Sequence, residues 1–208
     1  MTQARRPVVP PATIGMLGGG QLGKYALVAA NAMGYRTVVV DPDVTAPAGI
    51  VADTHLATAY DDAGALAHLA ADCAVVTTEF ENAPAAALAH LAESVLVAPA
   101  ATAVAIAQDR IAEKSFLSER GIAVGPYVAA PLGFDETERA RAHELACDGA
   151  VVKTARLGYD GKGQRRVSSP AQLDAALAEL AGDGIVEALL DLRMEVSLIV
   201  ARPPDGTG

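Results

Sequence analysis

Hydrophobic residues near the start of the chain follow two different spacings. A short apolar run over residues 12–17 stops at Gly18-Gly19-Gly20, and apolar residues then recur three and four positions apart over residues 21–33. A second apolar run, residues 35–41, follows Gly34. Spacings of three and four predict a helix, and short continuous apolar runs predict buried strands. The sequence therefore predicts a strand, a helix and a second, parallel strand.

The same alternation continues to about residue 98. The further elements that it predicts are helices over residues 63–71 and 84–92 and strands over residues 74–77 and 96–98. Strands that alternate with helices of roughly ten residues are typical of an α/β fold, in which helices cover a parallel sheet. We expect a Rossmann-like domain over residues 12–100, preceded by a flexible tail over residues 1–11.

The pattern changes near Pro99. The elements predicted beyond it are helices over residues 100–107, 109–120, 136–146 and 170–181 and strands over residues 124–128, 150–154, 165–167, 185–188 and 195–201. Short strands interleaved with single helices are typical of an α+β module, which we expect at residues 101–208. Because the closing Pro-Pro-Asp-Gly-Thr-Gly resembles a hairpin tip, we expect this module to be truncated.

Composition narrows the class of protein. Of the 208 residues, 51% are hydrophobic and 4% aromatic, and the formal net charge is −9. The hydrophobic fraction indicates a folded core, whereas the charge and the scarcity of aromatic rings disfavour binding to nucleic acid or to an anionic membrane. No apolar run approaches the roughly 20 residues of a membrane span, and the start lacks a signal-peptide pattern, so we expect a cytoplasmic protein. Cys73 and Cys147 are expected to be buried free thiols.

A glycine motif follows the first predicted strand. Gly18-x-Gly20-x-x-Gly23 opens a predicted helix, and Asp41 ends the next predicted strand. This arrangement fits a dinucleotide site, where N–H groups at a helix start bind phosphate and an acid binds a ribose hydroxyl. The same loop also suits a plain tight turn or a substrate phosphate. The motif alone leaves these alternatives open.

A second glycine-rich loop follows Lys153, at the end of a predicted strand. It reads Gly-Tyr-Asp-Gly-Lys-Gly-Gln over residues 158–164, with a second lysine at Lys162. Such a loop can fold over a triphosphate, because its N–H groups meet phosphate oxygens without side-chain interference. It is not a Walker loop, since Gly-Lys-Ser/Thr does not occur there. The alternative is a hairpin turn with a solvated lysine.

Three further features carry polar groups to strand or helix ends. Glu187 begins Glu-Ala-Leu-Leu near a strand edge, which could present backbone groups to an adenine, and Glu195 lies eight residues later. Glu79 follows a strand at the edge where α/β folds bind ligands. Asp109 suits a helix N-cap, and Arg110 could reach a nucleotide. Each acid is also typical of a solvated surface.

These motifs occur in one order along the chain: Gly-Gly-Gly-Gln-Leu-Gly at 18–23, Glu-Phe-Glu-Asn at 79–82, Gln-Asp-Arg at 108–110, Lys153-Thr154, the loop at 158–164, Glu187 and Glu195-Val196-Ser197-Leu198. In this order they resemble the ATP-grasp carboxylate–amine ligases, and within them the 5-(carboxyamino)imidazole ribonucleotide synthases. The resemblance covers residues 12 to about 202. It implies a Rossmann-like (pre-ATP-grasp) domain followed by part of an ATP-grasp module.

The resemblance also implies a reaction, in which ATP and bicarbonate carboxylate 5-aminoimidazole ribonucleotide in purine biosynthesis. The residues that it implies for ATP are Arg110, Lys153, Gly158, Tyr159, Asp160, Gly161, Lys162, Gly163, Gln164, Glu187, Ala188, Leu189, Leu190 and Glu195. Lys153 and Lys162 would neutralise phosphate charge during transfer. The residues that it implies for the ribonucleotide are Gly20, Gln21, Leu22, Glu79 and Tyr159. Asp41 would then be ordinary strand-end polarity.

Length is the main departure from the family. By the resemblance, the carboxylates that bind Mg²⁺ lie beyond residue 208, so we expect no metal ligands in this chain and little activity from it alone. A homodimer is also implied. Other interpretations stay open: an ATP-grasp ligase with another amine acceptor, a dinucleotide-dependent oxidoreductase, or a nucleotide-binding fragment without activity.

Overall fold

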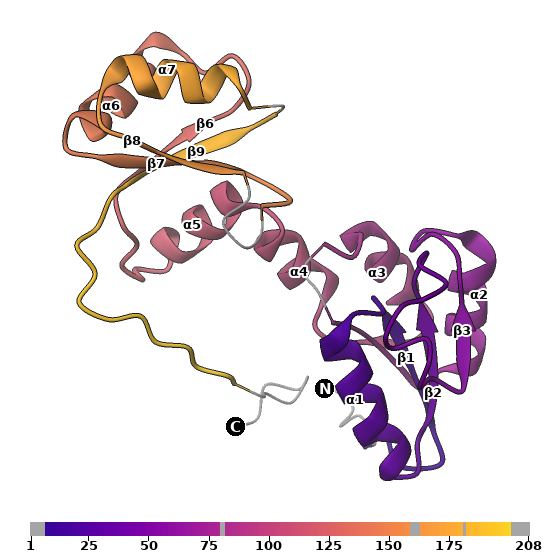
Figure 1. Ribbon diagram of the computed structural model, residues 1–208. Helices are drawn as coiled ribbons and strands as arrows, with labels where there is room; N and C mark the ends of the chain where they lie inside the picture. Colours follow the sequence, from indigo (N-terminus) through magenta and orange to yellow (C-terminus); the bar gives the residue numbers. More distant parts are fainter. Residues whose placement is uncertain (1–6, 80–81, 159–162, 181, 201–208) are drawn as a thin grey trace. The chain divides into compact units, whose positions relative to one another are not determined.

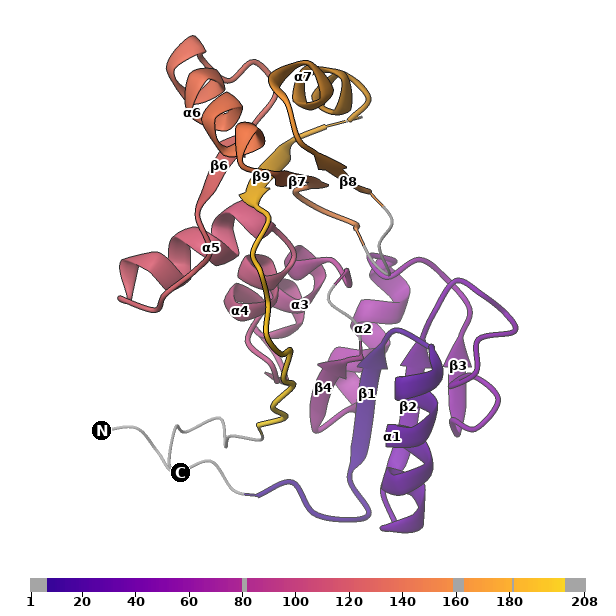
Figure 2. The ribbon, with the colours of Figure 1, turned by 60° about the vertical axis from the view of Figure 1, so that its left-hand side comes forward.

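The computed structural model describes residues 7–79, 82–158, 163–180 and 182–200. These residues divide into two compact units. The first comprises the described residues up to Ala105 together with 199–200, and the second spans Ile106–Leu198 (Figures 1 and 2). No helix in the described ranges is long and apolar enough to span a bilayer.

The first unit is built on a parallel sheet of five strands in the order β3-β2-β1-β4-β5. The strands are β1 (Thr13–Leu17), β2 (Arg36–Val40), β3 (Thr54–Leu56), β4 (Val75–Thr78) and β5 (Leu96–Val97), and the helices are α1 (Gln21–Ala32), α2 (Ala63–Asp72), α3 (Ala85–Leu91) and α4 (Ala101–Ala107). The predicted α/β order is confirmed, with β3 as an addition. The sequence analysis missed β3 because Thr-His-Leu contains no apolar run.

Alternation along the strands divides the core of this unit into two layers. Met16 and Val39 pack with Leu27 of α1, whereas the neighbouring residues Leu17 and Val40 belong to a larger cluster. That cluster contains Leu69 of α2 and Leu88 of α3. Successive side chains of a strand point to opposite faces, so α1 covers one face of the sheet and α2 and α3 cover the other (Figure 2).

The strand order creates a switch point beside β1. The chain leaves β1 toward β2 on one side, and β4 pairs with β1 on the other. In open parallel sheets, ligands bind at the carboxyl ends of the strands where the order reverses. The segments that begin at Gly18 and at Glu79 both start there.

The second unit contains an antiparallel sheet of four strands in the order β6-β9-β7-β8. Its strands are β6 (Tyr127–Ala130), β7 (Ala150–Thr154), β8 (Gln164–Val167) and β9 (Gly184–Ala188), and its helices are α5 (Arg110–Glu119), α6 (Glu136–Cys147) and α7 (Pro170–Ala178). The predicted cap is confirmed: the Asp109 side chain accepts hydrogen bonds from the first turn of α5.

The two faces of this sheet differ in chemistry. Val128, Val152 and Val186 lie in a buried cluster with side chains of α6 and α7. Their strand neighbours Lys153 and Glu187 lie on the opposite face, where Glu187 contacts a lysine of α5. Figure 1 shows α6 and α7 together on one side of the sheet and α5 on the other.

Two predictions about the second half of the chain were wrong. Residues 195–200 form no strand, and their apolar side chains, such as Val196 and Ile199, are largely exposed. A strand requires a neighbour for its N–H and C=O groups, and none of the described strands pairs with this segment. Cys147 is exposed at the last residue of α6, whereas Cys73 is buried as predicted.

Candidate functional site

The loop after β1 is tightly packed around its glycines. Gly18 has φ of 104°, a conformation that glycine adopts without strain. A side chain at Gly19 would place its Cβ atom 2.7 Å from the Cβ atom of Ala46 and 2.8 Å from that of Asp41. These close approaches explain why glycines occupy the turn between β1 and α1.

Asp41 holds this loop from the end of β2. Its side chain is 8% exposed, and its Oδ2 atom accepts hydrogen bonds of 2.7 Å from the Gly19 amide and 2.7 Å from the Tyr60 hydroxyl. Burial, together with this hydrogen bond to Asp41, raises the pKa of Tyr60 far above its usual value. The expectation of ordinary strand-end polarity at Asp41 was therefore wrong, because the carboxylate is a buried internal partner of the glycine loop.

Glu79 occupies the start of α1. Its Oε1 atom accepts a hydrogen bond of 3.0 Å from the Gly20 amide, and its Oε2 atom accepts one of 3.2 Å from the Gly23 amide. A carboxylate is favoured at this position because the first N–H groups of a helix lack helical partners. Gly20 and Glu79, both predicted for the ribonucleotide, therefore lie together. Gln21 and Leu22 are exposed beside them in the first turn.

These bonds change the expected role of the glycine loop. The amides of Gly19, Gly20 and Gly23 all donate to the protein's own carboxylates. A dinucleotide pyrophosphate would need such donors, so the arrangement disfavours the dinucleotide interpretation. The Glu79 carboxylate favours instead a partner that donates hydrogen bonds, such as a ribose hydroxyl or an amine.

In the second unit, Lys153 and Glu187 form an ion pair. The Nζ atom of Lys153 lies 2.9 Å from the Oε2 atom of Glu187, and the side chains are 26% and 16% exposed. Lys114 of α5 approaches the same oxygen at 3.6 Å and is 17% exposed. The sequence analysis missed Lys114, although it lies four residues after Arg110 and so shares a face of the same helix.

Arg110 anchors the start of the second glycine-rich loop. Its guanidinium donates hydrogen bonds of 3.1 Å to the Thr154 carbonyl and 2.8 Å to the Gly158 carbonyl. At the other end of the loop, the Gly163 carbonyl accepts a 2.8 Å hydrogen bond from the Thr154 amide. The start of the loop is therefore held by Arg110 of α5, and its other end by the last residue of β7. Tyr159, Asp160, Gly161 and Lys162 lie outside the described residues.

The remaining predicted residues are dispersed. Gln164 is the exposed first residue of β8, and Ala188 ends β9. Leu189 and Leu190 follow it, each about half exposed. Glu195 lies in the exposed segment after β9, and the structure gives it no ion pair with a described residue. It is therefore not brought together with Lys153 and Glu187.

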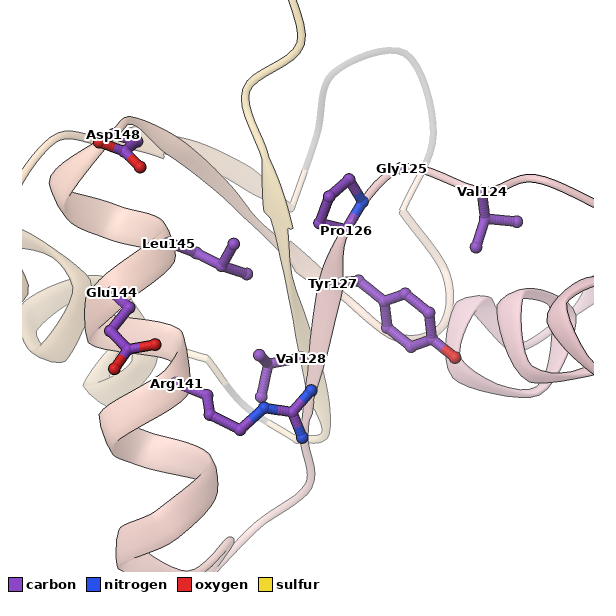
Figure 3. A pocket seen from close by; sticks show the side chains of 9 residues that line it. All are labelled: Val124, Gly125, Pro126, Tyr127, Val128, Arg141, Glu144, Leu145 and Asp148. Carbon is purple, nitrogen blue, oxygen red and sulfur yellow. The ribbon is translucent and has the colours of Figure 1, made fainter.

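Two cavities in the second unit differ in their relation to these residues. One of about 540 Å³ lies between β6 and α6, and its lining residues are Val124, Gly125, Pro126, Tyr127, Val128, Arg141, Glu144, Leu145 and Asp148 (Figure 3). This lining combines apolar side chains with the charged Arg141, Glu144 and Asp148, and it contains none of the predicted site residues. A smaller cavity of about 380 Å³ lies at the base of the glycine-rich loop, lined in part by Thr154, Gly163 and Asp183.

Metal ligands do not gather in the part of the chain that the structure describes. Within those ranges, no three His, Cys, Asp or Glu side chains come close enough to hold an ion. Glu79 is bound to backbone N–H groups and Glu187 to lysines.

Comparison with known families agrees with the two-unit architecture. Residues 11–108 match the ribonucleotide synthetase preATP-grasp domain, and residues 115–208 match the ATP-grasp domain. The chain therefore contains a preATP-grasp domain followed by an ATP-grasp domain. Among proteins similar to this chain, one from Brucella melitensis named N5-carboxyaminoimidazole ribonucleotide synthase is 43% identical over 95% of this chain and 54% of its own length.

Solved structures of ATP-grasp proteins share the fold. The N5-carboxyaminoimidazole synthetase of Staphylococcus aureus complexed with ADP is 36% identical, with a TM-score of 0.81 over 89% of this chain and 49% of that one. The Aspergillus clavatus N5-carboxyaminoimidazole synthase, in complex with ADP and 5-aminoimidazole ribonucleotide, is 26% identical, with a TM-score of 0.72 over 88% and 48%. The chain thus spans about half the length of the relatives that it matches.

Proposed function

We propose that this chain forms the nucleotide- and ribonucleotide-binding part of an enzyme that carboxylates 5-aminoimidazole ribonucleotide. The reaction consumes ATP and bicarbonate and yields N5-carboxyaminoimidazole ribonucleotide in de novo purine biosynthesis. The observation that carries the proposal is the 43% identity, over 95% of the chain, to a relative with that name.

The second unit would bind ATP. Lys153 lies on β7, the strand that leads into the glycine-rich loop, and Arg110 of α5 binds the start of that loop. Both carry positive charge that suits phosphate. Lys153, with Lys162 of the loop, would neutralise charge as the terminal phosphoryl group moves to bicarbonate. Glu187 and residues 188–190 would face the adenosine, and Glu195 would join them.

The first unit would bind the ribonucleotide. Glu79 and the amides near Gly20 stand at the switch point of the sheet, where a ligand is expected. The Glu79 carboxylate can accept hydrogen bonds from ribose hydroxyls or from the exocyclic amine. Gln21, Leu22 and Tyr159 are the other residues that we assign to this ligand. The domains proposed for these roles are residues 12–100 and 101–208.

Several further features of the enzyme are part of the proposal. Phosphoryl transfer requires a divalent cation to bridge the phosphates. Among the described residues, no cluster of His, Cys, Asp or Glu side chains would hold Mg²⁺. The same proposal includes a cytoplasmic location and a homodimer.

Ligand binding and ADP release test the proposal. We expect the 208-residue chain to bind ADP and 5-aminoimidazole ribonucleotide in calorimetry. We also expect ADP release that depends on the ribonucleotide once the chain is extended to the length of its relatives. Binding of NADH in place of the ribonucleotide would contradict the proposal. ADP release stimulated only by a different amine would identify another ligase of the same family.

A further inference from the structure

The carboxylate of Glu187 lies between two lysines from different elements. Its Oε2 atom is 2.9 Å from the Nζ atom of Lys153 on β7 and 3.6 Å from the Nζ atom of Lys114 on α5. The three side chains are between 16% and 26% exposed. The group therefore combines two positive charges and one negative charge at a largely buried position.

Lys114 is held in place by more than this ion pair. Its ammonium lies 5.6 Å from the centre of the Tyr127 ring, within the range of a cation–π contact. Tyr127 of β6 is the strand partner of Glu187, so ring and carboxylate share one face of the sheet. One helical turn earlier, Arg110 reaches the Thr154 and Gly158 carbonyls. Helix α5 thus directs two cations to the ends of β7 and β9.

The ammonium of Lys153 has two competing partners, the Glu187 carboxylate and the phosphate of a nucleotide. In the present structure its ammonium is engaged by Glu187. If Lys153 is to contact a phosphate, as the proposed function requires, that ammonium must turn away. A largely buried carboxylate that loses its only counter-charge is strongly destabilised. Lys114 already touches the same oxygen, so it can remain as the counter-charge when Lys153 moves.

We propose that Lys114 is a positioning residue of the nucleotide site, which retains the charge balance of Glu187 so that Lys153 can bind the polyphosphate. Lys114 itself stays with Glu187 and Tyr127 and makes no phosphate contact. This inference rests on the proposed binding of ATP by the second unit.

Binding of ADP and adenosine to the 208-residue chain tests this role. In Lys114→Met the carboxylate retains only Lys153 as a partner, so ADP should bind about tenfold more weakly, the loss of one charge-assisted contact. Adenosine has no phosphate, so its affinity should be unchanged. Lys114→Arg keeps the charge and should restore most of the ADP affinity. Arg120→Met is the matched control: it removes a cation from the exposed end of the same helix, where the guanidinium stacks on Phe116.

A double variant separates positioning from direct contact. If Lys114 acts only through Lys153, Lys114→Met should weaken ADP binding no further in a Lys153→Met background. An additional tenfold loss there would mean that Lys114 contacts phosphate itself, and would overturn the inference. Unchanged ADP binding in the single variant, with urea unfolding confirming a native fold, would also overturn it. Failure of the wild-type chain to bind ADP would instead reject the proposed function, and the inference with it.

Discussion

The Oδ2 atom of Asp41 lies 2.7 Å from the amide nitrogen of Gly19, 22 residues earlier in the chain. Through this bond the end of β2 fixes the turn that follows β1. Tyr60 donates a second hydrogen bond to the same oxygen, so one buried carboxylate joins three segments of the first unit. The glycine loop is therefore positioned by the protein before any ligand binds.

Replacement of Asp41 should destabilise the first unit. Asp41→Ala leaves the Gly19 amide and the Tyr60 hydroxyl without their acceptor in a buried position, and we expect the free energy of unfolding to fall by about 2–3 kcal/mol. Urea unfolding followed by circular dichroism measures this change. Asp43→Ala is a suitable control, because the Asp43 side chain is exposed and accepts its hydrogen bonds from the nearby Thr45, while the backbone amide that donates to Asp41 is kept in the variant. Equal effects of the two variants would contradict the role of Asp41.

Substitutions of Glu79 and of Lys153 should each weaken the binding of a different ligand. Glu79→Gln places an amide group against the N–H groups of Gly20 and Gly23. The affinity for 5-aminoimidazole ribonucleotide should therefore fall about tenfold, while ADP binding is retained. Lys153→Met should weaken ADP by a similar factor and leave the ribonucleotide unaffected. Calorimetry of both variants with both ligands provides the comparison. Loss of both ligands in either variant would contradict the assignment of one ligand to each unit.

Gly163 should not tolerate a side chain. Its φ is 72°, and an added Cβ atom would lie 2.7 Å from the Oγ1 atom of Thr154. Gly163→Ala should therefore reduce the free energy of unfolding by about 1–2 kcal/mol. Gly182→Ala is the matched control, since a Cβ atom added there would have no described atom within 4 Å and the φ of Gly182 is not in the left-handed region. Similar urea midpoints for wild type and Gly163→Ala would contradict this expectation.

The sequence predicted the local parts of the fold well, because they depend on spacing within a segment. The helix after Gly20, the strand ending at Asp41 and the cap at Asp109 all follow from neighbouring residues. The segment at 195–200 has the apolar pattern of a strand but remains unpaired, because a strand depends on its neighbour as well as on its own sequence.

The sequence proposes residues for the candidate site but does not give their contacts. Motif order identified Glu79, Lys153 and Glu187, but it could not show that Glu79 binds Gly20 from 59 residues away. Lys114 belongs to no recognised motif, and only the packing of α5 against the sheet places it at Glu187. Asp41 was misjudged for the same reason, since its partners Gly19 and Tyr60 are distant in sequence.

Asp174 should make the free energy of unfolding depend on pH in the acid range. On α7, its carboxylate lies 3.0 Å from the His143 imidazole and 2.8 Å from the Arg139 guanidinium, both on α6. The hydrogen bond from His143 and these positive charges lower the pKa of Asp174. A lowered folded-state pKa contributes stability above the unfolded value of about 4, and this contribution is lost as pH falls through the folded value.

The corresponding variant gives a direct measurement of this effect. Because the Asp174 side chain is 43% exposed, we expect Asp174→Asn to cost only ~0.5 kcal/mol near pH 6. The difference from wild type should begin to shrink as pH falls below about 4 and close below the folded-state pKa, where the wild-type carboxylate is also neutral. Urea unfolding at several pH values measures the difference. A gap of equal size at pH 6 and pH 3 would exclude a role for the charge.

The two cysteines should react at very different rates. Burial, with a smaller contribution from the negative charge of Asp72, raises the pKa of Cys73 to about 11, and its sulfur packs close to Gly15 and so has little access to reagents. Because the thiolate is the reactive form, Cys73 should be almost inert at pH 8. Cys147 is exposed at the end of α6 and should react readily with a disulfide reagent such as dithionitrobenzoate. We expect one cysteine of the native chain to react quickly, releasing one equivalent of the coloured thiolate of the reagent, and the second to react only in denaturant. Cys147→Ser should remove the fast phase. Two fast thiols in the native chain would mean that the layer of α2 and α3 opens far more readily than its buried cluster indicates.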